Sequence, residues 1–353
     1  MSAPQLRALA KGQREAPGFF VDLQNNGGYL AGLVKDFSSA SLSLADAIGV
    51  IGDARKRGVL ICPTTITQPF DQLRRNLGII AAALESEQMK GRWLHCEGPF
   101  FSGKDGAIGA HPTAHIAPAN VAMLEQMIEA SRDTIFAITV GADVANICQV
   151  IEAAVKQGLK VFLGHHIPSI SQLDEAVSAG ATWCTHLWNG APKLLERQGF
   201  VDYQLDSRCL GAMVIADGIH VQDHCLRLAF RVKARDQLIV VSDRSPLGGA
   251  PAQEGYWYNL WDKVACVVSK PTGGRMIVGP DGYFAGSWAD MVQCMNYVLK
   301  LLMRWNVERG DDEQFSEDDF WQVGCLNPAA VLGRSVDELA QLVPLKLAIV
   351  SIC

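Results

Sequence analysis

The sequence predicts an α/β fold in which eight parallel strands close into a (β/α)8 TIM barrel. Short apolar runs recur along the chain, each ends in polar residues, and a longer helical pattern follows. Strand–helix alternation is typical of a parallel sheet, and eight near-continuous apolar strands favour its closure. The predicted strands span residues 19–24, 59–66, 92–97, 135–140, 160–165, 182–187, 211–218 and 238–243.

The segments between these runs have the periodicity of helices that lie on a sheet. Apolar residues recur every three to four positions in 44–58, 68–87 and 144–158. A glycine just before the next strand is expected to end a helix, because glycine readily adopts the left-handed conformation of that position. The glycines in such places are Gly58, Gly158 and Gly180.

After residue 243 the pattern is less regular. Residues 250–285 indicate a loop with short strands, and two further helices are expected near 287–304 and 316–333. A doubly wound open sheet is the alternative fold. No Gly-x-Gly-x-x-Gly follows the first strand, so the sequence offers no support for a dinucleotide site of that fold.

Composition excludes several classes of protein. The chain has 353 residues, of which 49% are hydrophobic and 19% charged, as in a globular protein with one large core from roughly residue 17 to 335. A net charge of -6 argues against a nucleic-acid partner. No apolar run is long enough for a membrane helix, and the start lacks the apolar segment of a signal peptide. Ten scattered cysteines without a Cys-x-x-Cys pair indicate reduced thiols in a cytoplasmic protein.

The ends of the predicted strands carry most of the polar side chains that could do chemistry. They are Asp22, Gln24, Thr64, Thr65, His95, Glu97, Thr139, His165, His166, His186, Asp217, His220 and Asp243. Barrel enzymes place catalytic groups at this end of the strands. Imidazoles and carboxylates that converge there suggest a metal-dependent hydrolase, because three N/O side chains and a water commonly hold a catalytic zinc ion.

Each of these residues also has a purely structural interpretation. A single histidine near a strand end is often a hydrogen-bonded core residue, and Asp243 could cap the turn that it begins. Spacing alone leaves both interpretations open.

Several motifs follow one another between residues 17 and 333. They are Pro17-Gly18-Phe-Phe-Val-Asp22-Leu-Gln24, His95-Cys-Glu97-Gly98-Pro99-Phe100, Gly109-Ala110-His111-Pro112, Leu163-Gly164-His165, Thr185-His186-Leu-Trp-Asn189, Ala216-Asp217-Gly218-Ile219-His220, Val241-Ser242-Asp243, Phe284-Ala-Gly286-Ser287 and Asn327-Pro328-Ala329. In this order they resemble the N-acetylglucosamine-6-phosphate deacetylases, barrel enzymes of the amidohydrolase superfamily. Glu-Gly-Pro and Thr-His-Leu-x-Asn are the specific motifs among them.

The resemblance implies a role for each matched residue. Glu97, His165 and His186 would bind one divalent metal ion, with zinc expected first and iron, cobalt and manganese as alternatives. Asp243 would be the general acid and base, and His220 a catalytic group beside the substrate. The implied substrate-binding residues are Ala110, Asn189, Gly190, Arg197 and His220. Amide hydrolysis needs these parts, because an amide is a poor electrophile with a poor leaving group.

Neighbouring residues are assigned by comparison with the same family. His165 is preferred over His166 as the ligand, His111 is expected to organise its loop, and His95 is expected behind the ligands on the same face as Glu97. Arg197 matches an arginine that resembles a phosphate clamp. The loop around it departs from the family, so an exposed arginine without that role is the alternative.

Amides occupy the end of the first strand. Many amidohydrolases have His-x-His there, which binds a second metal ion. Gln24 and Asn26 stand in those places here and match the branch that uses one metal. We therefore expect one metal ion per chain, with the amides hydrogen-bonded to water or substrate.

The chain also departs from the family at its ends. The family carries a small β-sandwich built from both termini, whereas 16 residues precede Pro17 here and the tail lacks the usual pattern. The sandwich is expected to be absent or reduced to remnants in 1–16 and 336–353, through a trimmed lineage or wrong gene ends. Arg244 and Ser245 follow Asp243 where small or apolar residues are usual, and could change the pocket.

The leading hypothesis is therefore a deacetylase that converts N-acetylglucosamine 6-phosphate to glucosamine 6-phosphate and acetate. One alternative is an amidohydrolase for a different N-acyl amino sugar, and the other is a non-catalytic barrel that binds sugar phosphates. The expected partner is a small amino sugar phosphate, with neither nucleic acid nor membrane, and the resemblance allows a homodimer.

Overall fold

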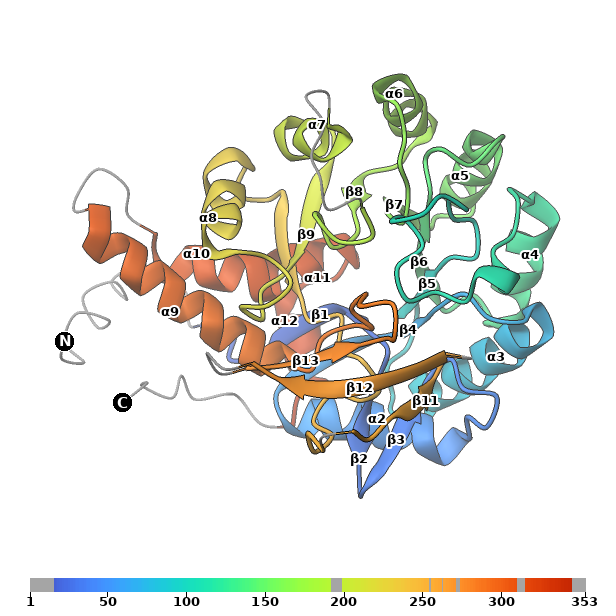
Figure 1. The fold of residues 1–353 in the computed structure, drawn as a ribbon, viewed down its shortest axis with the longest axis horizontal. Coiled ribbons are helices and arrows are strands. Elements are labelled where there is room, and N and C mark those ends of the chain that lie inside the picture. Colours follow the sequence, from blue (N-terminus) through green and yellow to red (C-terminus); the bar gives the residue numbers. More distant parts are fainter. Residues whose placement is uncertain are drawn as a thin grey trace.

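An eight-stranded parallel sheet forms the centre of the molecule, in the order β1-β4-β5-β6-β7-β8-β9-β10 (Figure 1). The computed structural model describes residues 16–191, 199–253, 255–261, 263–270, 274–309 and 315–344. The strands are β1 (Phe20–Asn25), β4 (Val59–Thr65), β5 (Leu94–Glu97), β6 (Ile135–Val140), β7 (Lys160–Leu163), β8 (Trp183–Cys184), β9 (Gly211–Ile215) and β10 (Leu238–Val241). Each strand overlaps one predicted from the sequence, and the (β/α)8 barrel is confirmed.

The first and last strands meet and close the barrel. Asn25 forms a parallel bridge with Arg244, and the Asn26 N–H donates to the Arg244 carbonyl at 2.9 Å. The Ser242 N–H and hydroxyl donate to the Asp22 carboxylate at 3.0 and 2.5 Å. These contacts exclude the open doubly wound sheet.

A helix follows each barrel strand and lies on the outside of the sheet (Figure 1). These helices are α2 (Leu44–Lys56), α3 (Phe70–Ser86), α4 (Val121–Ala130), α5 (Ile147–Lys156), α6 (Ile170–Ala179), α7 (Phe200–Asp206), α8 (Asp223–Val232) and α9 (Met291–Arg309). The three predicted glycine ends are confirmed, since Gly58, Gly158 and Gly180 have φ values of 74°, 77° and 115°.

The irregular segment predicted at 250–285 holds a small antiparallel sheet of β11 (Tyr258–Leu260), β12 (Lys263–Ser269) and β13 (Arg275–Val278). A hairpin of β2 (Gly27–Leu30) and β3 (Leu33–Asp36) lies near this small sheet. Tyr29 and Val34 of the hairpin pack against buried residues of the small sheet. These small sheets are consistent with a reduced β domain. The division into one barrel with terminal remnants stays a prediction, since 1–15 and 345–353 lie outside the described residues.

The last helical segments close the amino-terminal end of the barrel. They are α10 (Glu317–Trp321), a π-helical turn (Gln322–Leu326), α11 (Asn327–Val331) and α12 (Val336–Ala340). A separate short 3-10 turn, Thr113–His115, lies between β5 and α4. The Phe20 ring stacks on Trp321 with centroids 5.4 Å apart.

The described cysteines are all unpaired. Among the described helices, none combines the length and apolar character needed to cross a membrane.

Asp22 lies buried at the closure, and burial raises its pKa to about 6 against the Ser242 hydrogen bonds. Because the folded pKa lies above the unfolded one, folding takes up a proton between about pH 4 and 6, and stability falls as pH rises through that window. The Asp22→Asn variant does not lose this stability as pH rises. We therefore expect its free energy of unfolding, measured relative to that of the parent chain, to be up to about 3 kcal/mol higher at pH 7 than at pH 4. Urea denaturation at both pH values measures this difference.

Asp46→Asn is the matched control. Burial alone would raise the pKa of Asp46, but the Lys35 ammonium and the Ser43 hydroxyl lower it overall. Its carboxylate therefore adds stability that is lost as pH falls, and the variant should lose stability relative to the parent as pH rises. A constant difference between Asp22→Asn and the parent at both pH values would contradict the first prediction.

Candidate active site

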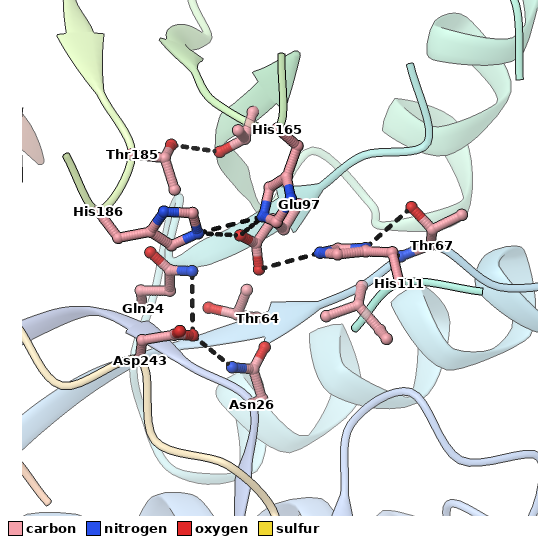
Figure 2. Close-up of polar contacts among 12 residues, drawn as sticks. Gln24, Asn26, Thr64, Thr67, Glu97, His111, His165, Thr185, His186 and Asp243 are labelled. Carbon is pink, nitrogen blue, oxygen red and sulfur yellow. Dashed lines mark hydrogen bonds and ion pairs between the residues drawn. The ribbon is translucent and has the colours of Figure 1, made fainter. Parts of the chain in front are cut away.

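Three side chains from three strand ends converge on one point at the mouth of the barrel (Figure 2). Glu97 ends β5, His165 follows β7 and His186 follows β8. The Nε2 atoms of His165 and His186 lie 3.0 and 2.9 Å from Glu97 Oε1, and 3.1 Å from each other. Zinc–ligand distances of about 2.0–2.2 Å place the ligand atoms of one ion roughly 3–3.5 Å apart. The cluster therefore has the dimensions of a divalent metal site.

Hydrogen bonding fixes the ring of His165 in the form that a metal ligand needs. Its Nδ1 lies 2.8 Å from the Ala107 carbonyl, which can only accept, so the proton is on Nδ1 and the neutral ring has a lone pair on Nε2. That lone pair faces the carboxylate oxygen of Glu97 and the Nε2 of His186. Acceptor atoms at this separation need a proton or a cation between them, so the donor set fits a metal ion.

The closeness of Glu97 to the two histidines also shifts the pKa values of these groups. Burial alone would lower the pKa of His186, but the Glu97 carboxylate raises it overall. Burial alone would raise the pKa of Glu97, but the two histidines hold it well below its usual range. A positive charge is thus stabilised at this point, and a metal ion would replace a proton there.

The backbone at these positions adopts an uncommon conformation. His165, His186 and Asp243 have φ values of 51°, 28° and 45°, in the left-handed region that side chains other than glycine rarely adopt. Such conformations cost about 1–3 kcal/mol each and gather at functional sites. The turns aim each side chain into the mouth of the barrel directly after its strand.

Asp243 faces the cluster from the end of β10 and binds both amides of the first strand (Figure 2). Gln24 Nε2 and Asn26 Nδ2 donate to Asp243 Oδ1 at 3.1 and 2.8 Å. Burial and then the negative charge of Glu97 raise the pKa of Asp243 to about 7. The amides therefore hold a carboxyl group that can exchange a proton near neutral pH, a contact that the sequence did not predict.

A cavity of about 440 Å³ opens over these side chains, within the usual range for a small-molecule site. Its lining includes Glu97, His165, His220, Asp243, Asn26, Ala110, Asn189 and Gly190. Gly190 is required by close packing, because a methyl group there would lie 2.9 Å from His165 Nδ1. The predicted substrate-binding residues thus face this cavity, except Arg197, which lies outside the described residues.

Comparisons with known proteins point the same way, although no protein-family model matches the chain. The N-acetylglucosamine-6-phosphate deacetylase of Bos taurus is 32% identical over 262 residues, which are 69% of this chain and 62% of the relative. The solved N-acetylglucosamine-6-phosphate deacetylase from Pasteurella multocida is 25% identical, with a TM-score of 0.75 over 91% of this chain and 77% of that chain. In sequence and in fold the chain is therefore similar to N-acetylglucosamine-6-phosphate deacetylases.

Two further facts qualify the likeness to these deacetylases. The chain spans less than two thirds of the length of the curated mammalian relatives that it matches, 62% of the bovine protein and 58% of the human one. The N-acetylgalactosamine-6-phosphate deacetylase of Escherichia coli O157:H7 is 29% identical over 194 residues, 54% of this chain and 50% of that relative. Relatives named for both epimeric sugars therefore match the chain.

Sequence reasoning missed a partner of His220 at this site. His220 Nδ1 lies 2.7 Å from Asp217 Oδ2, so Nδ1 carries a proton and donates to the carboxylate. Burial alone would raise the pKa of Asp217, but His220 lowers it overall to about 2. The other nitrogen, Nε2, is buried without a partner among the described residues, and His220 lines the cavity. The Asp-Gly-Ile-His spacing was the available signal.

His111 lies closer to the donor cluster than a loop-organising role suggests. Its Nδ1 lies 3.1 Å from the Thr67 hydroxyl oxygen, and its Nε2 lies 4.0 Å from Glu97 Oε2 (Figure 2). Its ring centroid is 4.3 Å from that of His165. His111 therefore forms the wall of the cavity beside Glu97.

Two other histidines that the sequence placed at strand ends lie away from the donor cluster. His95 is buried in the barrel, where Nδ1 donates to the Leu23 carbonyl at 3.2 Å and Nε2 lies 2.8 Å from Thr139 Oγ1. His166 accepts from the Ala142 N–H at 3.1 Å and contacts Gln204. Neither belongs to the three-residue donor set.

Arg244 does not change the pocket in the way the sequence suggested. Its side chain is 7% exposed, packs against Gly28 and Gly248, and donates to the Gly248 carbonyl at 2.9 Å. It is absent from the described lining of the cavity. The side chain instead fills a space between the β2–β3 hairpin and the loop after β10.

Proposed function

We propose that this chain hydrolyses the N-acetyl amide of an amino sugar 6-phosphate, with N-acetylglucosamine 6-phosphate as the first candidate substrate. One observation carries the proposal: Glu97, His165 and His186 gather within ligand distance of one ion, while Asp243 faces the same cavity. The products are glucosamine 6-phosphate and acetate. The names of the matched relatives support the choice of substrate.

The proposed cofactor is one divalent metal ion per chain, with zinc first and iron, cobalt or manganese as alternatives. When bound, the ion supplies Lewis-acid polarisation of the amide carbonyl and lowers the pKa of a water. Gln24 and Asn26 turn their N–H groups to Asp243 and offer neither an imidazole nor a carboxylate at the two positions that would bind a second ion. This contact supports a count of one.

The chain's own residues would perform the proton transfers and hold the substrate. Asp243 accepts a proton from the attacking water and gives it to the nitrogen of the leaving amine. Gln24 and Asn26 keep its carboxylate in place for both transfers. His220, oriented by Asp217, offers Nε2 to a substrate oxygen, and Asn189 and Gly190 line the sugar pocket.

Acetate release tests the proposal directly. The purified chain is loaded in turn with zinc, iron, cobalt and manganese, and given N-acetylglucosamine 6-phosphate, its galactose epimer, and the two sugars without phosphate. We expect turnover of a phosphorylated sugar with at least one metal and about one ion per chain by elemental analysis. No acetate with any metal would contradict the proposal, and turnover confined to free sugars would correct the substrate.

Three properties of the protein stay predictions from the sequence: the contact of Arg197 with a phosphate, the formation of a homodimer, and a cytoplasmic location. A phosphate contact from Arg197 would appear as a loss of affinity in Arg197→Met that is confined to phosphorylated sugars. Sedimentation of the metal-loaded chain measures the oligomeric state.

A further inference from the structure

The cavity over the metal cluster has an uneven distribution of charge. Two described residues of its lining are carboxylates, Glu97 and Asp243, and both belong to the proposed chemistry. Among the described lining residues, one carries an ammonium or guanidinium group, and that residue is Lys270. An anionic substituent on a substrate would be repelled by the carboxylates and attracted by this side chain.

Lys270 reaches the cavity from outside the barrel strands. It follows β12, and its N–H donates to the Gly274 carbonyl at 3.0 Å, just before β13. A methyl group at Gly274 would lie 3.3 Å from Ile219 Cδ1, so this part of the small sheet packs on the residue that precedes His220. Ile219, His220 and Lys270 all line the cavity. The small sheet thus supplies a wall of the site.

The charge of Lys270 is not neutralised by any described residue. Lys35 pairs with Asp46, Lys104 lies 3.0 Å from Asp143, and the Lys233 ammonium donates to three backbone carbonyls. Lys270 is half-buried and forms no ion pair within the described part of the chain. A partly desolvated ammonium without a counter-charge is a suitable partner for a phosphate, which it would bind as a point charge.

We propose that Lys270 binds the phosphate of the substrate and sets the preference for phosphorylated over free amino sugars. The assignment rests on the proposed function, because it takes the amide to lie at the metal cluster and the anionic group at the small sheet. Lys270 is then a residue for specificity, and it takes no part in the proton transfers. The irregular segment after β10 would supply a substrate contact that its sequence did not suggest.

Calorimetric binding separates this assignment from catalysis. The probes are glucosamine 6-phosphate and glucosamine, titrated into the metal-loaded parent chain and into Lys270→Met, Lys270→Arg and Lys300→Met. Lys300 is an exposed lysine of α9 and serves as the control. We expect Lys270→Met to weaken glucosamine 6-phosphate by about 10- to 100-fold, the effect of one hydrogen bond to a charged group. Binding of glucosamine should change less than about twofold, and Lys270→Arg should retain most of the affinity.

The outcomes distinguish the two proposals. An equal loss for both probes, no loss for either, or failure of the parent chain to prefer the phosphorylated probe would overturn the role of Lys270. If the parent chain releases no acetate while Lys270→Met still loses phosphate binding selectively, the deacetylase proposal fails and the assignment of Lys270 stands. If acetate is released with an unchanged preference in Lys270→Met, the function stands and the assignment fails.

Discussion

Asp243→Asn should lower kcat for acetate release by about 10²- to 10⁴-fold, the usual contribution of a general acid–base group. Asparagine keeps the shape of the side chain and an oxygen that can accept from Gln24 and Asn26, but it cannot take or give a proton. Glu97, His165 and His186 are untouched, so the variant should bind as much metal as the parent. Stopped assays of acetate with elemental analysis of the same samples measure both quantities.

The pH dependence adds a second measurement. Burial and the nearby Glu97 raise the pKa of Asp243 to about 7, and a bound cation would favour the carboxylate and lower this value. We therefore expect kcat/KM of the metal-loaded parent to fall on an acid limb below pH 7 and that limb to be absent from the variant. Asp202→Asn, an exposed aspartate of α7, is the control. Activity of Asp243→Asn within about threefold of the parent would remove Asp243 from the mechanism.

The strand positions could be predicted because they depend on local pattern. Buried runs such as Ile135–Val140 and Val59–Thr65 are apolar along most of their length, as strands covered on both faces must be. Barrel closure follows from the number and direction of such strands. Two helices expected near 287–304 and 316–333 were harder to bound, and the second is interrupted by a π-helical turn at Gln322–Leu326.

The candidate site could be predicted only as a set of residues at one end of the barrel. Position along a strand tells which side chains reach the mouth, and the resemblance to deacetylases selected Glu97, His165 and His186 among them. It could not tell that Gln24 and Asn26 bind Asp243, because those partners are more than 200 residues apart and meet only where β1 joins β10. Their proximity depends on the closed sheet.

Lys270 and Arg244 show that closeness to a motif in the sequence does not predict which side chains line the cavity. Arg244 follows a predicted catalytic residue, yet its side chain turns away and packs against glycines. Lys270 lies in a segment that indicated only loop and short strands, yet it lines the cavity. Sequence distance from a motif does not decide which side chains share a site when the segment 242–290, between β10 and α9, folds back over the barrel.

Glu97→Gln should abolish stoichiometric metal binding, with it acetate release, and leave the barrel folded. The substitution replaces the one anionic donor of the cluster by a neutral amide, a poorer ligand for a divalent ion. Mutation of a residue that hydrogen-bonds a metal ligand typically lowers metal affinity by about 10- to 100-fold. Because Glu97→Gln changes a ligand itself, we expect it to lower metal affinity by at least about 100-fold. Metal per chain after dialysis against a defined free-zinc buffer measures it.

The matched control is Glu125→Gln, an exposed glutamate of α4 that should bind metal like the parent. Without metal, Glu97→Gln also removes the charge that raises the pKa of His186, so the imidazole should titrate at lower pH in the variant by NMR. That shift would show that the side chains still meet when the metal does not bind. Full metal occupancy in Glu97→Gln would contradict the ligand assignment. Two ions per parent chain would contradict the interpretation of Gln24 and Asn26, because these amides hold Asp243 and supply no anionic or imidazole donor at their two positions for a second ion.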